Sequence, residues 1–261
     1  MATLLGIDVG TSGTKVIAID ESGKLVASAS ADYELSTPRP LWAEQNALDW
    51  WDAVCKCCQS IVAQIGADDI AGIGLAGQMH GLIMLDASHE VLRPAILWCD
   101  QRTQPQCDWI TETVGKDLLV AETANPVLTG FTAPKIVWAR DHEPQTFERA
   151  VMHLLPKDYI RFRLTGEFAT EVSDASGTSL LNVPERRWSR AVCDKIGVSL
   201  DHLPQMYESF EVSGRISALG AAATGLKEGT PVVGGGGDQA AGAVGNGIVQ
   251  SGIISVAMGT S

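Results

Sequence analysis

The chain has 261 residues, of which 45% are hydrophobic and 19% are charged, and this composition is typical of a folded globular protein. The formal net charge of −12 argues against a nucleic-acid-binding protein, because such proteins present basic surfaces to phosphates. No hydrophobic run approaches the roughly 20 residues needed to cross a bilayer, and the N-terminus enters a strand pattern directly, so we expect neither a membrane span nor a signal peptide.

Three strands are predicted at the start of the chain. Apolar or alternating residues occupy Leu4–Val9, Thr14–Asp20 and Lys24–Tyr33, and turns at Gly10–Gly13 and Glu21–Gly23 separate them. Short turns between strands of this length favour antiparallel neighbours. The pattern therefore predicts a three-stranded meander at the beginning of a mixed sheet.

A helix and two further strands follow. Asn46 is the expected N-cap of a helix that ends at Ile65, because apolar residues recur at helical spacing between them. Ile70–Ala76 is an apolar strand, which turns at Gly77–Gly81 into a second strand, Leu82–Asp86. The alternation of strand, helix and strand predicts the α/β class, with a mixed sheet and helices on both of its faces.

The second half of the chain is predicted to be richer in helices. Asp100–Val151 is interrupted by prolines and is expected to form helices and loops. Short helices are predicted at Lys157–Leu164, ending at a left-handed Gly166, and at Ser189–Ile196. Gly247 is the expected crossing between an N-terminal domain, 1–245, and the start of a second domain, 246–261.

The first candidate site is the turn that follows the first strand. Glycines allow backbone N–H groups to approach an anion, and the hydroxyl side chains add donors. A carboxylate at the end of the strand can hold a hydrated Mg²⁺, and the lysine adds positive charge. A plain β-hairpin is the alternative. The turn comprises Asp8, Gly10, Thr11, Ser12, Gly13 and Lys15.

The same pattern begins again at the end of the chain. An apolar stretch leads into Gly259, Thr260 and Ser261, as the first strand leads into Gly10–Ser12. Two such hairpins that face each other would grip the phosphates of a nucleoside triphosphate. The repetition therefore favours a nucleotide site over a plain hairpin.

A run of four glycines, Gly234–Gly237, precedes Asp238 and follows a short strand at Val232–Val233. Ordering so many glycines is costly in backbone entropy, so we expect a sharp bend beside a ligand. Asp238 is predicted in the first turn of a helix that ends at Val244, where the helix dipole keeps its carboxylate ionised. Such a carboxylate can accept the proton of a hydroxyl during phosphoryl transfer. The alternative is that Asp238 only caps the helix.

Two further segments suit a sugar. Gln78 and His80, in the turn Gly77–Gly81, carry amide and imidazole groups that bind hydroxyls, although the alternative is a tight turn with a packed Met79 and a surface histidine. Trp98 at the end of an apolar run can form the wall of a sugar pocket, and Asp100 can accept hydrogen bonds from hydroxyls. Core packing of Trp98 and helix capping by Asp100 are the alternatives.

The cysteines do not predict disulfides or a zinc site. Neighbouring positions on a helix point in different directions, and three of the cysteines lie on one predicted helix. The sequence has neither paired C-x-x-C motifs nor an H-x-x-x-H motif. We therefore expect free thiols in a reducing cytoplasm. The cysteines are Cys55, Cys57, Cys58, Cys99, Cys107 and Cys193.

Together these segments resemble the FGGY family of carbohydrate kinases, whose fold is the actin-like, ribonuclease-H-like ATPase fold. Two stretches, Gln-Met-His-Gly at 78–81 and Leu-Pro-Lys-Asp-Tyr at 155–159, point to the members that phosphorylate xylulose. The segments that carry the resemblance are GIDVGTSGTK (6–15), PLWAEQN (40–46), AGQMHG (76–81), RPAILWCDQRT (93–103), GFTAPKIVW (130–138), LLPKDYIRFRLTGEFATEVSDASGT (154–178) and GGGGDQAAGAVG (234–245).

The resemblance implies that D-xylulose is phosphorylated at its terminal hydroxyl, with ATP and Mg²⁺. It implies that Asp238 is the general base and that Asp8 lies beside the metal and the phosphates. Thr11, Ser12 and Gly13 would lie near the transferred phosphate. The residues that would line or flank the sugar are Met79, His80, Trp98 and Gln239.

The chain departs from the family pattern in two ways. Cys99 stands where the xylulose-phosphorylating members more often have Asn. Family members are nearly twice as long, and their second domain holds most of the adenine and ribose site, so we expect residues 1–261 alone to be inactive. A kinase of ribulose, fuculose or glycerol, and a non-catalytic actin-like module that binds sugar or nucleotide, are the alternatives. A homodimer is left open.

Overall fold

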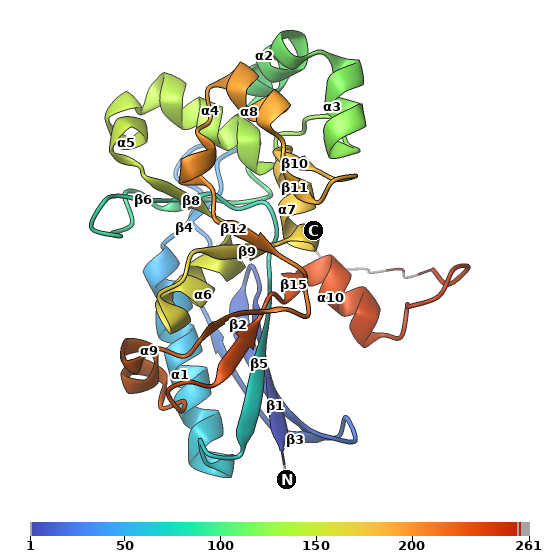
Figure 1. Ribbon diagram of the computed structural model, residues 1–261. Coiled ribbons are helices and arrows are strands. Elements are labelled where there is room, and N and C mark those ends of the chain that lie inside the picture. Colours follow the sequence, from blue (N-terminus) through green and yellow to red (C-terminus); the bar gives the residue numbers. More distant parts are fainter. Residues whose placement is uncertain (1, 255, 257–261) are drawn as a thin grey trace.

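The computed structural model describes residues 2–254 and 256, and its centre is a mixed sheet (Figure 1). β1 (Thr3–Val9), β2 (Gly13–Asp20) and β3 (Leu25–Asp32) form an antiparallel meander, since β1 pairs with β2 and β2 pairs with β3. The predicted meander is confirmed. Buried residues alternate along β1 and β2, as expected for a sheet with one face on the core.

The buried face of the sheet packs against α1 (Ala47–Ile65). Asn46 caps this helix as predicted, because its side chain accepts a hydrogen bond from the backbone N–H of Leu48. The chain then enters β5 (Ile70–Gly77), which runs parallel to β1 on the side away from β2. Helix α1 therefore lies between the N-terminal meander and the central strand β5, which is the α/β arrangement that the sequence predicted.

The other edge of the sheet comes from the C-terminal part of the chain. β14 (Pro231–Val233) runs parallel to β5, and β13 (Val212–Arg215) runs antiparallel to β14, which gives the order β13-β14-β5-β1-β2-β3. β15 (Gly236–Gly237) also pairs with β5, beyond the end of β14. The sequence did not predict β15, because glycines carry no side-chain alternation that would indicate a strand.

A second lobe of helices lies over one end of the sheet (Figure 1) and has a separate hydrophobic core. Short two-stranded sheets connect it to the rest of the molecule. One of them explains why Leu82–Asp86 does not extend the main sheet: the strand there is only Ile83–Leu85, and it pairs with β8. The lobe's helices are α2 (Gln104–Val114), α3 (Lys116–Thr123), α4 (Thr132–His142), α5 (Pro144–Arg149) and α8 (Arg190–Ile196). The small sheets pair β4 (Glu44–Gln45) with β7 (Ala95–Ile96), β6 (Ile83–Leu85) with β8 (Met152–Leu154), β9 (Ala169–Glu171) with β12 (Gln205–Tyr207), and β10 (Leu181–Asn182) with β11 (Arg187–Trp188).

Short helices complete the chain. α6 (Pro156–Thr165) ends at Gly166, whose φ of 82° confirms the predicted left-handed C-cap, and Ser189 caps α8 through its hydroxyl. The remaining helices are α7 (Val172–Ala175), η1 (Ser176–Thr178), η2 (Leu200–His202), α9 (Ala218–Thr224) and α10 (Asp238–Gly245).

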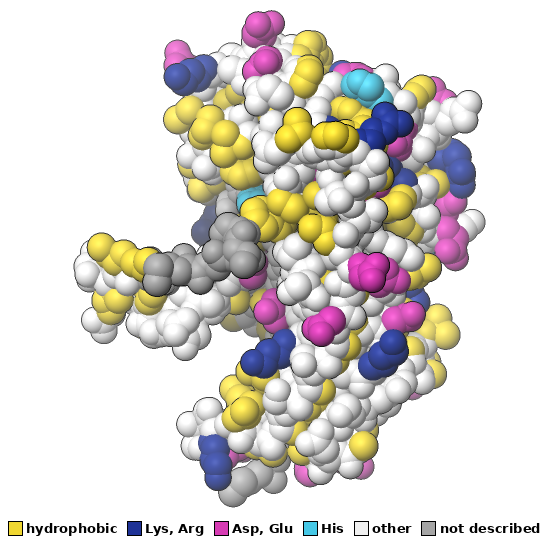
Figure 2. Space-filling view, turned by 180° about the vertical axis from the view of Figure 1, so that it is seen from behind, with side chains coloured by type: hydrophobic (Ala, Val, Ile, Leu, Met, Phe, Trp, Pro, Cys, Tyr) yellow, Lys and Arg dark blue, Asp and Glu magenta, His cyan; other side chains and the backbone are white. Residues whose placement is uncertain are grey.

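Acidic and basic side chains are interspersed over the face shown in Figure 2, while apolar side chains occur on the segment that projects after α10. Val249, Ile253 and Ile254 of this segment are exposed. All six cysteines have free thiols. Within residues 2–254, no helix combines the length and hydropathy that a membrane span requires. Gly259, Thr260 and Ser261 lie outside the described residues, so the second hairpin stays a prediction.

Candidate functional site

The register of the sheet brings the candidate segments to one edge. Val9 of β1 and Gly237 of β15 both pair with Gly77 of β5, and Asp8 and Gly236 both pair with the residue before it. Neighbouring strands lie about 4.8 Å apart. The turns that follow β1, β5 and β15 therefore start side by side, and these turns carry the predicted phosphate, sugar and base residues.

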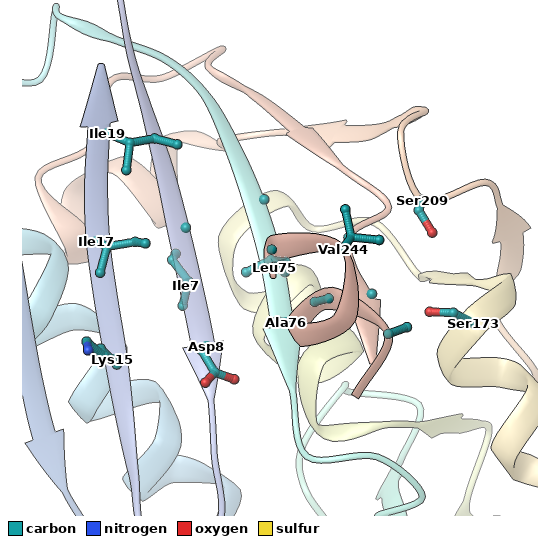
Figure 3. A pocket seen from close by; sticks show the side chains of 17 residues that line it. Ile7, Asp8, Lys15, Ile17, Ile19, Leu75, Ala76, Ser173, Ser209 and Val244 are labelled. Carbon is teal, nitrogen blue, oxygen red and sulfur yellow. The ribbon is translucent and has the colours of Figure 1, made fainter. Parts of the chain in front are cut away.

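A cavity of about 720 Å³ lies between the sheet and α10. Figure 3 shows that Asp8 and Lys15 lie at one end of this cavity, while Ile19 lies toward the other end. Ile17 and Val244 add apolar walls from β2 and α10. The charged end of the cavity is the end closest to the turns described above, so charged and apolar parts of a ligand would separate along it.

Two carboxylates, Asp8 and Asp238, lie near each other at this edge. Burial raises the pKa of Asp8, the charge of Asp238 raises it further, and Lys15, its cross-strand neighbour, lowers it. Burial also raises the pKa of Asp238, whose Oδ1 accepts a 2.7 Å hydrogen bond from the backbone N–H of Gln239. Asp238 is half-buried at the start of α10 and Gln239 is exposed.

The predicted phosphate hairpin is held by hydrogen bonds from the protein interior. Tyr33 donates to the carbonyl of Gly10 at 2.6 Å, and the Gln45 amide donates to the carbonyl of Thr11 at 2.7 Å. Neither Gly10 nor Gly13 has a positive φ. Glycine is needed at Gly13 for space instead, since a Cβ there would lie 2.8 Å from the carbonyl oxygen of Ala31.

His80 occupies a strained and closely fixed position in the turn after β5. Its φ is 68°, its ring stacks on Phe131 with centroids 4.7 Å apart, and its Nδ1 lies 2.7 Å from the carbonyl oxygen of Gly177. Burial lowers the pKa of His80 to about 4, so the imidazole is neutral near pH 7. Because a carbonyl only accepts, Nδ1 carries the proton and Nε2 remains an acceptor. A neutral imidazole with a defined tautomer suits recognition of a hydroxyl.

The sequence analysis missed Lys135, which holds the His80 backbone. The lysine is fully buried, and its Nζ donates to the carbonyl oxygens of His80 at 2.7 Å and Gly130 at 2.5 Å. Thr132 donates to the same His80 carbonyl at 3.1 Å. Both residues lie on α4, within the segment that resembles the kinase family, although the motif itself does not reveal a backbone contact.

Lys135 should make stability depend on pH. Burial lowers its pKa to about 7, whereas an unfolded lysine has a pKa of about 10.4. Between these values the unfolded chain binds more protons than the folded chain, so the free energy of unfolding contributed by this residue rises with pH. We expect the rise to be absent in Lys135→Met. Chemical denaturation of both proteins from about pH 7 to pH 9.5 measures it, and parallel profiles would contradict the assignment.

The turn Gly77–Gly81 and the glycine run Gly234–Gly237 touch each other. Met79 packs on Gly237, because a Cβ at Gly237 would lie 2.8 Å from the Met79 sulfur. Gly235 has a φ of 74°, and a side chain there would clash with the carbonyl of Leu75. Two of the four glycines are thus explained: Gly235 by its left-handed backbone and Gly237 by its contact with the turn Gly77–Gly81.

A buried ionic cluster supports the start of the glycine run Gly234–Gly237. Lys157 Nζ lies 2.8 Å from Asp158 Oδ1 and 3.5 Å from Asp174 Oδ2. The Arg161 guanidinium donates to the carbonyl oxygen of Val233 at 2.6 Å and to that of Gly234. These bonds fix the segment that leads into Asp238. The cluster comprises Lys157, Asp158, Arg161, Glu171 and Asp174, all fully buried.

The same cluster is linked by hydrogen bonds through Ser173 to Gly237, the last residue of the glycine run. Glu171 accepts hydrogen bonds from the backbone N–H groups of Ser173 and Asp174, which start α7. The Ser173 hydroxyl in turn accepts a 3.2 Å hydrogen bond from the backbone N–H of Gly237. Gly237, the residue before Asp238, is therefore held by Ser173 on one side and by Met79 on the other.

Two predicted sugar ligands are turned into the interior. Gln78 is 1% exposed, and its amide bonds to the side chains of Thr11 and Gln45. Asp100 is fully buried, and its carboxylate accepts hydrogen bonds from Arg102 and from the backbone N–H of Ala43. These partners argue against the direct sugar contacts predicted for both residues. Trp98 is half-buried, and its role as a pocket wall stays a prediction.

The chain was compared with families and proteins of known sequence. The model of the FGGY family of carbohydrate kinases, N-terminal domain, matches residues 3–245. The xylulose kinase of Bacillus subtilis is 45% identical over 263 residues, which cover 100% of this chain and 52% of that protein. The xylulose kinase of Escherichia coli is 44% identical over 257 residues, covering 98% of this chain and 52% of that protein. The chain thus spans about half the length of the curated relatives it matches.

Solved structures agree with the sequence comparison. The crystal structure of xylulose kinase from Rhodospirillum rubrum superimposes with a TM-score of 0.92 at 29% identity, over 96% of this chain and 52% of that chain. The architecture is therefore the actin-like ATPase fold of the sugar kinases, as predicted.

Proposed function

The chain belongs to the FGGY family of carbohydrate kinases, and from that premise we propose that the complete protein transfers the γ-phosphate of ATP to the terminal hydroxyl of D-xylulose. The relatives that are 44% and 45% identical are named xylulose kinases. This similarity favours xylulose over ribulose, fuculose or glycerol. The carboxylate retained at Asp238 favours an enzyme over a non-catalytic binding module.

The observation that carries the proposal is the contact between Met79 and Gly237. It joins the turn that would bind the sugar to the residue immediately before the candidate base. A sugar held against Met79 and His80 would therefore present a hydroxyl close to Asp238. Trp98 and the exposed Gln239 would flank it, as the family resemblance implies.

In the proposed reaction Asp238 accepts the proton of the attacking hydroxyl, while the hydroxyl oxygen forms a bond to the γ-phosphorus and ADP departs. The Gly10–Gly13 hairpin would hold the phosphates through backbone N–H groups and the Ser12 hydroxyl. Lys15 would add positive charge beside them. The predicted hairpin at Gly259–Ser261 would grip the nucleotide from the opposite side.

The residues at the edge of the sheet fit a hydrated Mg²⁺. Asp8 lines the cavity, and burial and the charge of the nearby Asp238 raise its pKa, so a divalent cation beside Asp8 would relieve the repulsion between the two carboxylates. Carboxylate oxygens and water are the ligands that Mg²⁺ prefers. When bound, the ion would neutralise charge on the transferred phosphate. We propose Asp8 as its holder, through water.

Domain organisation belongs to the same proposal. We propose that 1–245 form the sugar-binding domain and that 246–261 begin the nucleotide-binding one. Closure of two such domains would exclude water from the phosphate. Residues 1–261 alone should then phosphorylate xylulose poorly, and a cytoplasmic location would suit a protein that uses ATP.

The direct test is a coupled assay of ADP release by the complete protein with D-xylulose, D-ribulose, L-fuculose and glycerol. We expect kcat/KM for xylulose to exceed the others by at least about tenfold, the effect of about 1.4 kcal/mol in transition-state binding. A higher kcat/KM for another sugar would reassign the substrate. No phosphorylation of any of them would refute the kinase proposal.

A further inference from the structure

A chain of side-chain hydrogen bonds joins the candidate sugar pocket to the phosphate hairpin. The Trp98 indole N–H donates to Thr11 Oγ1 at 2.9 Å. Thr11 donates to Gln78 Oε1 at 3.3 Å, and Gln78 Nε2 donates to Gln45 Oε1 at 3.0 Å. The other end is Trp50, whose indole N–H donates to the same Gln45 oxygen at 3.0 Å. We call this set, Trp50, Gln45, Gln78, Thr11 and Trp98, the Trp–Thr chain.

The direction of every bond in the Trp–Thr chain is fixed by its ends. An indole nitrogen only donates, so the Gln45 atom that faces Trp50 is its oxygen. The Gln78 atom that faces this oxygen is then the nitrogen, and the Gln78 oxygen faces Thr11. The single hydroxyl proton of Thr11 goes to Gln78, which leaves a lone pair for the Trp98 N–H.

The interior part of the Trp–Thr chain is buried. Trp50, Gln45 and Gln78 are exposed by 0%, 2% and 1% respectively. Gln78 also donates to the carbonyl oxygen of Gly10 at 3.3 Å, and Gln45 donates to that of Thr11 at 2.7 Å. The hairpin backbone and the Thr11 hydroxyl are therefore positioned by the same two amides, and only Trp98 and Thr11 reach the partly exposed surface.

We propose that the Trp–Thr chain couples sugar binding to nucleotide binding, so that D-xylulose against Trp98 raises the affinity of the Gly10–Gly13 hairpin for ATP. The proposal rests on the function proposed above. A sugar that orders the Trp98 ring strengthens its bond to Thr11, and the ordered hairpin then binds phosphates at a smaller cost in conformational freedom. Thermodynamic linkage requires ATP to raise the affinity for the sugar by the same factor.

Gln78 acquires a different role in this proposal. It is a positioning residue that orients Thr11, rather than a ligand of the sugar. This role explains why a glutamine occupies the turn Gly77–Gly81 although its side chain is buried. A nonpolar residue of similar size would leave Gln45 Oε1 with one donor fewer and free the Thr11 hydroxyl to rotate.

Calorimetry of the complete protein tests the coupling. The dissociation constant of a non-hydrolysable ATP analogue is measured with and without saturating D-xylulose, and the ratio is the coupling factor. In Trp98→Phe, which keeps an apolar ring but loses the N–H, we expect the coupling factor to fall about fivefold, the effect of one neutral hydrogen bond. Thr11→Val should cause the same fall, and the double variant should show no further fall.

Two controls separate coupling from damage to the fold. Trp188→Phe also removes an indole N–H, which donates to the Pro204 carbonyl at 2.8 Å, and it should keep the wild-type coupling factor. Thr11→Ser keeps the hydroxyl and should restore most of the coupling that Thr11→Val loses. Unchanged factors in Trp98→Phe and Thr11→Val, or losses that multiply in the double variant, would overturn the proposal.

The wild type distinguishes the two proposals. If it phosphorylates xylulose and binds the nucleotide equally well with and without the sugar, the coupling proposal fails and the function stands. If it binds no xylulose, both fail.

Discussion

Asp238→Asn in the complete protein is expected to lower kcat by about 10²–10⁴-fold, the usual loss when a general base is removed. The amide is nearly the same size as the carboxylate, and its oxygen can still accept the bond from the Gln239 N–H. The substitution therefore removes proton acceptance and keeps the helix start. Steady-state kinetics measures kcat, and calorimetry should show that xylulose still binds.

The matched control is Asp117→Asn, which makes the same change in the first turn of α3 at an exposed position. It should leave kcat unchanged. The wild-type pH profile adds a second criterion: burial raises the pKa of Asp238, so kcat should fall as pH drops through a value above the ordinary aspartate pKa of about 3.9. Near-normal turnover of Asp238→Asn would remove Asp238 from the role of base.

Lys157→Met is expected to destabilise the folded protein by about 3–5 kcal/mol, because breaking a buried ion pair leaves uncompensated charge in the interior. Lys157 lies against Asp158 and Asp174, and all three side chains are fully buried. Both carboxylate oxygens of Asp174 lack a hydrogen-bond partner, and burial raises its pKa well above the ordinary value. The lysine is thus the main compensation for this carboxyl group. Urea denaturation measures the loss.

The matched control is Lys227→Met, which breaks a surface pair of similar length, 2.8 Å from Lys227 Nζ to Asp68 Oδ1. This substitution should change stability little, because water already screens the pair. Adding Asp174→Asn to Lys157→Met should recover part of the loss, since the buried carboxyl group that faced Lys157 is replaced by an amide that never ionises. Equal losses for the two lysines, or no recovery, would contradict the role of the buried ionic cluster.

The predictable parts of the fold are those that local patterns specify. Asn46 and Gly166 mark helix ends through capping chemistry that acts within a few residues. The first three strands are joined by short turns, which allow few other pairings. By contrast, β15 consists of two glycines, and the Arg161 guanidinium and Ser173 hold the chain beside it through hydrogen bonds. Such distant contacts leave no local pattern.

The candidate site also contains residues that the sequence indicates and residues that it does not. Asp238 and His80 are noticeable in the sequence because they follow glycines or lie in a turn between apolar strands. Lys135 is not, because it acts on the carbonyl of His80, and a carbonyl is present at every residue. Asp100 was expected to bind sugar, but Arg102 and the Ala43 N–H use its oxygens. Side-chain direction depends on partners that the sequence does not identify.

The packing of Met79 on Gly237 has a consequence for enzyme engineering. A smaller residue at Met79 would enlarge the proposed sugar pocket for bulkier substrates, but it would also leave a void beside the glycine that precedes Asp238. Broader specificity and slower turnover should therefore arise together from changes at this position. Directed evolution toward new sugars would have to begin elsewhere on the pocket wall, or include a second substitution that fills the void.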